Sequence, residues 1–206
     1  MKTKHNPYDR LESDSGLFLT ANADMVKPEE VLIIAPKYNS GTRHDATGAF
    51  HLGVDMFREV HEARKSRILL FDNRHGRYAV ADQVLAAMKD SPTKVLADFS
   101  HGYQYGIQAG IRCPNHPFVT EKDIARWNEF CDILSVGVDD GFTAPVVLLF
   151  ACSTGDDPDG DPDTAPGSGD GSFADSLRDA LCERWATQCR ILSHTTAGDY
   201  RLNRDE

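Results

Sequence analysis

The chain lacks the patterns that mark several common functional classes. Its five cysteines include no Cys-x-x-Cys pair, and their odd number argues against a disulfide framework or a zinc site. No Gly-x-Gly-x-x-Gly follows the first apolar segment, and neither Gly-x-x-x-x-Gly-Lys-Ser/Thr nor Gly-x-Ser-x-Gly occurs. The sequence therefore argues against a dinucleotide-binding fold of the usual kind, a P-loop nucleotide hydrolase and a serine hydrolase.

The sequence also has little positive charge and no long apolar run. With 32 acidic and 22 basic residues the formal net charge is −10, so we expect no nucleic-acid partner. No apolar run approaches the roughly 18 residues of a membrane span, so we expect no membrane partner. The beginning of the sequence has no apolar core of the kind found in secretory signals. We expect a reducing, cytoplasmic setting in which a free thiol persists.

Apolar segments alternate regularly with amphipathic ones. Short apolar segments predict buried strands at residues 31–35, 67–71, 94–99, 146–150 and 190–193. Amphipathic stretches predict helices at residues 52–64, with Met56 and Phe57 on the inner face, at 78–89, after Thr120, and after a capping Ser172. Residues 103–118 are aromatic and irregular. This alternation predicts one α/β domain over residues 1–206, with a mostly parallel sheet covered on both faces. Within it, residues 1–30 are weakly patterned and 156–171 form an acidic flexible loop.

Two chemically reactive side chains end two consecutive predicted strands. His101 follows the strand at 94–99, and Cys152 follows the strand at 146–150. The carboxyl ends of parallel strands meet at one sheet edge, and adjacent strands lie about 4.8 Å apart, so neighbouring strands would bring the two side chains together. The imidazole could then remove the thiol proton, and the thiolate could attack a carbonyl carbon. The backbone N–H groups of Gly102 and Cys152 are candidate donors to the resulting oxyanion.

Other interpretations of these residue types stay open. A cysteine at the end of a buried strand is commonly only a small core residue, and Cys131 and Cys182 fall on apolar helix stripes. His75, which precedes a glycine, and His194, which follows the last predicted strand, are alternative bases.

Two segments resemble the paired signature of the caspase-like cysteine peptidases, the clan of caspases, gingipains and legumains with its CHAT and metacaspase branches. They are Val-Leu-Ala-Asp-Phe-Ser-His-Gly at 95–102 and Val-Val-Leu-Leu-Phe-Ala-Cys at 146–152. In that clan one apolar strand ends in His-Gly and the next in Ala-Cys or a similar pair, and the caspase histidine precedes its cysteine by about 50 residues. The glycine-rich segment at 169–177 is similar to a helix start of CHAT-type members.

The resemblance covers roughly residues 31–198. It implies a three-layer α/β/α fold with a caspase-like sheet of flavodoxin-like strand order. It also implies a cysteine endopeptidase that cleaves protein or peptide substrates, with Cys152 as nucleophile and His101 as acid and base.

The residues after the cysteine depart from the caspase pattern. Ser-Thr-Gly at 153–155 replaces the Arg-Gly or Gln-Gly of true caspases, so the chain is not a caspase proper. The resemblance implies that the following loop helps to build the substrate pocket. Here that loop is acidic from Asp156 onward and, with Asp98, is a candidate site for a basic P1 side chain. Arg43, placed like the caspase arginine that binds an acidic P1, predicts the opposite preference. A solvated linker is a third interpretation.

The acidic loop also has some features of a calcium site. Asp157, Asp159 and Asp161 alternate along the chain, and calcium takes six to eight oxygen ligands. Two interrupting prolines and the absence of the glutamate of an EF-hand loop argue against calcium, and we expect no other cofactor. Two further functions stay open. One is a catalytically inert caspase-like interaction or scaffold domain. The other is a flavodoxin-like phosphate-binding domain, which the missing glycine-rich phosphate loop disfavours.

Overall fold

The centre of the molecule is a parallel five-stranded sheet in the order β2-β1-β3-β7-β8. Its strands are β1 (Val31–Pro36), β2 (Arg67–Phe71), β3 (Val95–Asp98), β7 (Val146–Leu149) and β8 (Arg190–Ser193). The computed structural model describes residues 26–38, 47–60, 65–75, 77–91, 93–103, 106–108, 118–120, 146–151, 172–185 and 190–193. The five predicted strands and the flavodoxin-like order are confirmed.

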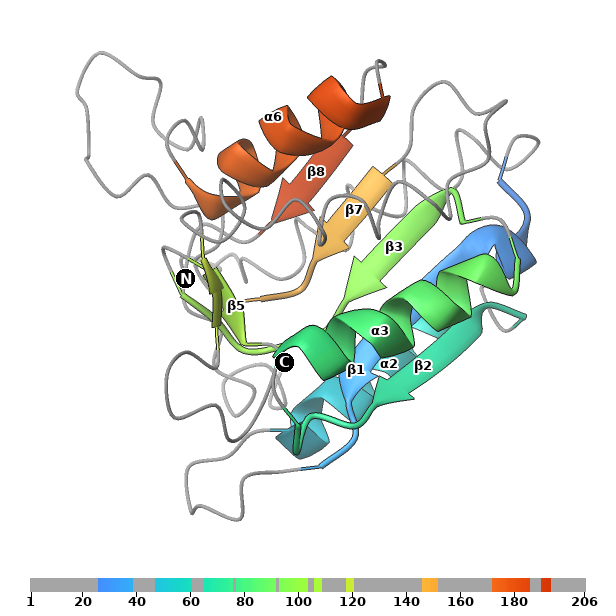
Figure 1. Cartoon of the computed structure of the whole chain (residues 1–206). Helices are drawn as coiled ribbons and strands as arrows, with labels where there is room; N and C mark the ends of the chain where they lie inside the picture. The colour runs from blue at the N-terminus through green and yellow to red at the C-terminus, as the bar shows by residue number, and fades with distance from the viewer. Residues whose placement is uncertain are drawn as a thin grey trace, which may run out of the picture.

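Helices cover both faces of the sheet, which gives the expected three layers (Figure 1). A short 3-10 helix, η1 (Pro28–Glu30), leads into β1, and α2 (Thr47–Val60) covers one face. The opposite face carries α3 (Arg77–Lys89) and α6 (Phe173–Trp185). The predicted cap of α6 is confirmed, because the N–H of Asp175 donates to Ser172 Oγ at 3.2 Å.

Strand residues alternate between two apolar cores because successive side chains point to opposite faces. On β1, Ile33 and Ala35 pack on the α2 side, whereas Leu32 and Ile34 pack on the α3 and α6 side. All of β1, β3 and β7 is buried, as expected for strands covered on both faces. The helix residues that close the two cores are Val54 and Phe57 of α2, Val80, Ala81, Val84 and Met88 of α3, and Phe173, Ala174, Leu177 and Leu181 of α6.

Three predictions about local structure are wrong. Helix α2 begins at Thr47, earlier than predicted, and Met56 is 46% exposed because the inner face is centred on Val54 and Phe57. Residues 103–118 are not wholly irregular. They contribute to a small antiparallel sheet of β4 (Gly102–Tyr103), β5 (Gly106–Gln108) and β6 (Phe118–Thr120). Ile107 of β5 is buried in the apolar core on the α3 and α6 side of the main sheet, and so fixes the small sheet to it.

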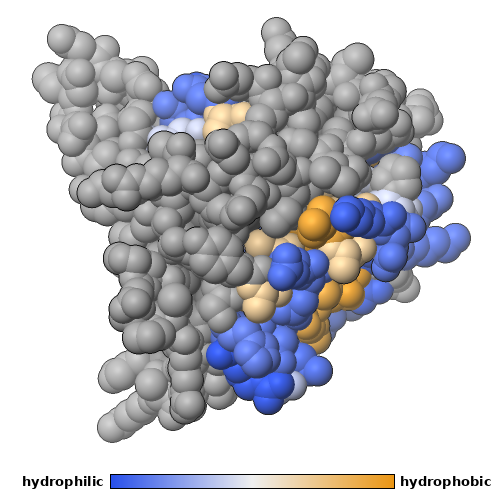
Figure 2. Space-filling view, in the orientation of Figure 1, coloured by the Kyte–Doolittle hydropathy of each residue, from blue (hydrophilic) through white to orange (hydrophobic). Residues whose placement is uncertain are grey.

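The surface is apolar at the outer edge of the sheet. Ile68 and Leu70 of the edge strand β2 are 39% and 41% exposed. Figure 2 shows apolar residues gathered over α3 and beside β2, bordered by hydrophilic ones. No helix in the described part of the chain is both long and apolar enough to cross a membrane.

Candidate functional site

Of the predicted catalytic pair His101 and Cys152, the structure describes His101, which lies just beyond the end of β3. Phe99 and Ser100 are buried, His101 is half-buried, and Gly102 opens β4. The hydrogen-bonded pairing of β3 with β1 continues past the end of β3, since the N–H of Phe99 donates to Ile34 O at 2.9 Å. His101 therefore follows a segment that is held by backbone hydrogen bonds almost up to the imidazole.

The neighbour of β3 on its other side is β7. The two strands are parallel and pair one to one, from Val95 with Val146 to Asp98 with Leu149. The N–H of Phe150 donates to Asp98 O at 2.8 Å, so this pairing also continues past the strand ends. Ala151 is buried, and Cys152, which is bonded to it, lies outside the described residues.

An aromatic cluster joins these two strand ends. The rings of Phe99 and Phe150 are stacked, with centroids 4.3 Å apart and planes 6° apart. Phe57 of α2 meets both rings edge-on, at 5.9 Å from Phe99 and 5.5 Å from Phe150. A Cβ on Gly53 would lie 3.2 Å from two Phe99 ring carbons, so the glycine allows α2 to approach the cluster closely.

The first turns of α2 reach the same edge of the sheet. The ring of Phe50 meets the imidazole of His101 in a T-shaped contact, with centroids 4.8 Å apart and planes at 77°. Next to Phe50, His51 Nε2 donates to Pro36 O at 2.9 Å and ties α2 to the end of β1. Neither contact was predicted, because the predicted helix began only at residue 52.

Asp98 is a buried acid at the end of β3. Its side chain is 3% exposed, and its carboxylate accepts a 2.6 Å hydrogen bond from Ser100 Oγ. Burial raises the pKa of Asp98 to about 7, and the Ser100 hydrogen bond opposes part of that rise. The carboxyl group therefore changes its charge near neutral pH.

Gly102, a predicted oxyanion donor, pairs with Ile107 across the small sheet. The alternative base His75 is exposed in the turn after β2, and β1 and β3 separate β2 from β7. His101, and not His75, therefore follows the strand next to β7. The remaining predicted site residues lie outside the described residues; they are Arg43, Cys152, Asp156, Asp157, Asp159, Asp161 and His194.

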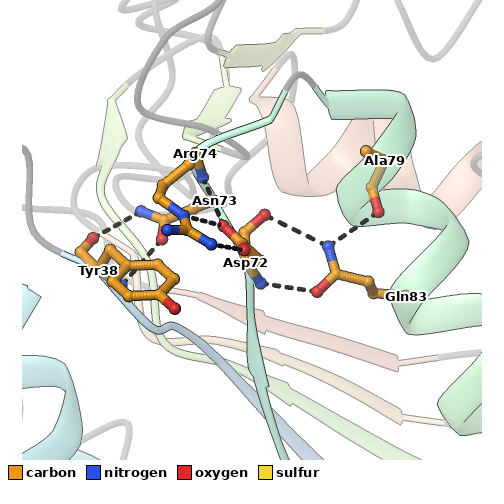
Figure 3. A network of polar contacts seen from close by, with 6 residues as sticks. All are labelled: Tyr38, Asp72, Asn73, Arg74, Ala79 and Gln83. Carbon is orange, nitrogen blue, oxygen red and sulfur yellow. Dashed lines mark hydrogen bonds and ion pairs between the residues drawn. The ribbon is translucent and has the colours of Figure 1, made fainter.

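A polar network that the sequence did not reveal joins the ends of β1 and β2 (Figure 3). Asn73 exchanges two hydrogen bonds with the backbone of Tyr38, accepting from its N–H at 3.0 Å and donating to its carbonyl at 2.8 Å. Arg74 forms a bidentate pair with Asp72, and its guanidinium lies 4.1 Å from the centroid of the Tyr38 ring. Hydrogen bonds from Arg74 hold the pKa of Asp72 at about 2.

The rest of this network reaches helix α3. Gln83 accepts from the N–H of Asp72 at 2.7 Å and donates to the carbonyl of Ala79 at 2.9 Å (Figure 3). The network thus fixes the start of the segment that leads from β1 to α2, on which Arg43 lies. The turn-forming pair Asp72-Asn73 after a predicted strand was the available sequence signal.

Within the described ranges, no three His, Cys, Asp or Glu side chains gather in a way that could hold a metal ion. The chain matches no protein-family model, no curated protein and no solved structure.

Proposed function

We propose that the chain is a cysteine endopeptidase of the caspase-like clan, with Cys152 as nucleophile and His101 as acid and base. The observation that carries this proposal is the register of β3 on β7. Asp98 pairs with Leu149, so three further steps in the same register would pair His101 with Cys152. The stacked rings of Phe99 and Phe150 support the first of these steps.

The alternation of side chains supports the same pairing. Ala97 and Phe99 of the β3 segment pack on the α2 side of the sheet, as do Leu148 and Phe150 of the β7 segment. His101 contacts Phe50 of α2, on that side. Continued alternation along an extended chain would direct Cys152 to the same side as His101.

The proposed reaction uses only groups at this edge. His101 takes the proton of the Cys152 thiol, and the thiolate attacks the scissile carbonyl carbon. The N–H groups of Gly102 and Cys152 hold the oxyanion, and His101 gives its proton to the leaving amine. Water, deprotonated by His101, then attacks the thioester and releases the acid product and the free thiol.

We propose a basic P1 side chain as the preferred substrate feature. Asp98 is a poor candidate for contacting that side chain, because it is 3% exposed and its register partners Ile34 and Leu149 pack on the face of the sheet opposite to His101. The acidic segment beginning at Asp156 would supply the attraction, whereas Arg43 would favour an acidic P1 side chain.

A positional-scanning library of fluorogenic peptides tests activity and P1 preference together. We expect cleavage after Arg or Lys by the wild type and none above background by Cys152→Ala. His101→Gln should lose about 10²- to 10⁴-fold in kcat, the range of general acid–base catalysis. Cys182→Ala is the matched control, because Cys182 has no role in the proposed reaction and its loss should not affect turnover. Turnover retained by Cys152→Ala would exclude the proposal.

Iodoacetamide separates the enzyme from an inert interaction domain without any knowledge of the substrate. A thiol activated by an adjacent imidazole should be alkylated at Cys152 well before Cys131 and Cys182. His101→Gln should remove this difference. Labelling of Cys152 that is no faster than that of the other cysteines would instead favour the inert domain.

A further inference from the structure

The contact between Phe50 and His101 joins two segments that are far apart in the sequence. Phe50 belongs to the first turns of α2, and His101 follows β3. Their rings meet in a T-shaped arrangement at 4.8 Å and 77°, which is a preferred geometry for aromatic pairs. Phe50 is partly buried and also packs against the apolar core on the α2 side, which limits the movement of its ring.

Two further contacts hold this part of α2 in place. His51 donates from Nε2 to Pro36 O at 2.9 Å, which fixes the helix to the end of β1. Gly53 lies so close to Phe99 that an added Cβ would approach its ring to 3.2 Å, which brings the helix against the end of β3. The Phe50 ring is therefore presented by a turn that is fixed to both neighbouring strands.

We propose that Phe50 is a positioning residue for His101, held in place by the His51–Pro36 hydrogen bond. This inference rests on the proposed function, because the orientation of the imidazole matters to catalysis only if His101 serves as acid and base. A general base must lie within hydrogen-bond reach of the proton that it removes. The half-buried imidazole can rotate about two side-chain torsions, and the Phe50 ring restricts those rotations on one side.

Three variants separate positioning from packing. Phe50→Leu keeps an apolar side chain but removes the ring, and should lower kcat about tenfold with KM changed less than about twofold. Phe50→Tyr keeps the ring and should restore kcat. Phe57→Leu is the matched control, since Phe57 lies two turns further along α2 and contacts Phe99 and Phe150. It should lower thermal stability at least as much as Phe50→Leu, because Phe57 is 2% exposed and Phe50 is only partly buried, while kcat falls less.

Nuclear magnetic resonance gives a second measurement that does not depend on turnover. In the full chain, the His101 ring signals, assigned with His101→Gln, should carry a ring-current shift from Phe50. That shift should disappear in Phe50→Leu and persist in Phe50→Tyr and Phe57→Leu. Unchanged His101 signals in Phe50→Leu, or equal kcat in Phe50→Leu and wild type, would overturn the inference. Turnover retained by Cys152→Ala would overturn the proposed function instead, and the ring-current result would still report the Phe50–His101 contact.

Discussion

Phe99 and Phe150 stack almost parallel, with ring centroids 4.3 Å apart. They lie one step beyond the paired residues Asp98 and Leu149, at the ends of β3 and β7. Each precedes one member of the proposed dyad by two residues, Phe99 before His101 and Phe150 before Cys152. The stack therefore holds together the two strand ends on which the proposed chemistry depends.

Replacing Phe150 with Leu should weaken both the fold and the site. The substitution removes the stack on Phe99 and the edge contact with Phe57, so we expect the free energy of unfolding to fall by about 1–2 kcal/mol. Alkylation of Cys152 by iodoacetamide should also slow. Phe71→Leu is the control, because Phe71 is also buried, at the end of β2, but belongs to the other core. If both variants slowed alkylation equally, the stack would have no special role at the site.

Replacing Asp98 with Asn should change how stability depends on pH. The pKa of Asp98 is raised to about 7 in the fold, against about 3.9 in an unfolded chain. Between pH 4 and pH 7 the folded state therefore binds one more proton than the unfolded state. The stability contributed by the protonated Asp98 carboxyl group is fully present below pH 4 and is lost as the pH rises through 7.

Asp98→Asn resembles the protonated acid and can still accept the Ser100 hydrogen bond. We expect the variant to match the wild type near pH 4 and to exceed it by roughly 2–4 kcal/mol at pH 8. Urea unfolding at both pH values measures this difference. A wild-type protein that is more stable than the variant at pH 8 would contradict the burial argument.

Asn73 should matter more to stability than the charged pair beside it. Asn73 is 5% exposed and satisfies both backbone groups of Tyr38, so Asn73→Ala leaves those groups without their partner (Figure 3). We expect a loss of about 2–3 kcal/mol in the free energy of unfolding. Arg74→Ala breaks an exposed ion pair with Asp72 and should cost much less than Asn73→Ala. The reverse ranking in urea unfolding would refute this account.

Arg67 should not be replaceable by lysine. Its guanidinium donates three hydrogen bonds, to Glu29 O at 2.8 Å, Ala87 O at 2.7 Å and Thr93 Oγ1 at 2.6 Å. A single ammonium group cannot reach all three acceptors, so Arg67→Lys should lower the free energy of unfolding by about 1–3 kcal/mol. Arg178→Lys is the matched control, because the Arg178 guanidinium is about half exposed where it pairs with Asp175 and Asp179, so this change should alter the free energy of unfolding little. Equal losses of stability in the two variants would argue against a special role for the three Arg67 hydrogen bonds.

The main sheet was predictable because its signals are local. The prediction for β2 matches Arg67–Phe71 residue for residue, and α3 differs by one residue at its start. Continuous apolar runs identify strands that are buried on both faces. The small sheet was missed because Gly106–Gln108 and Phe118–Thr120 are too short to show a period, and their pairing depends on distant partners.

By itself the sequence determined the alternation of strands and helices and the placing of His101 and Cys152 directly after two strands of one sheet. These features follow from apolar periodicity along short segments. Only the tertiary structure decided that β3 and β7 are neighbours in a register that continues through Phe99 and Phe150. It also decided that Phe50 meets His101 and that Asp98 is buried. Contacts of this kind join residues far apart in the chain, and they arise only when several elements pack together and exclude water.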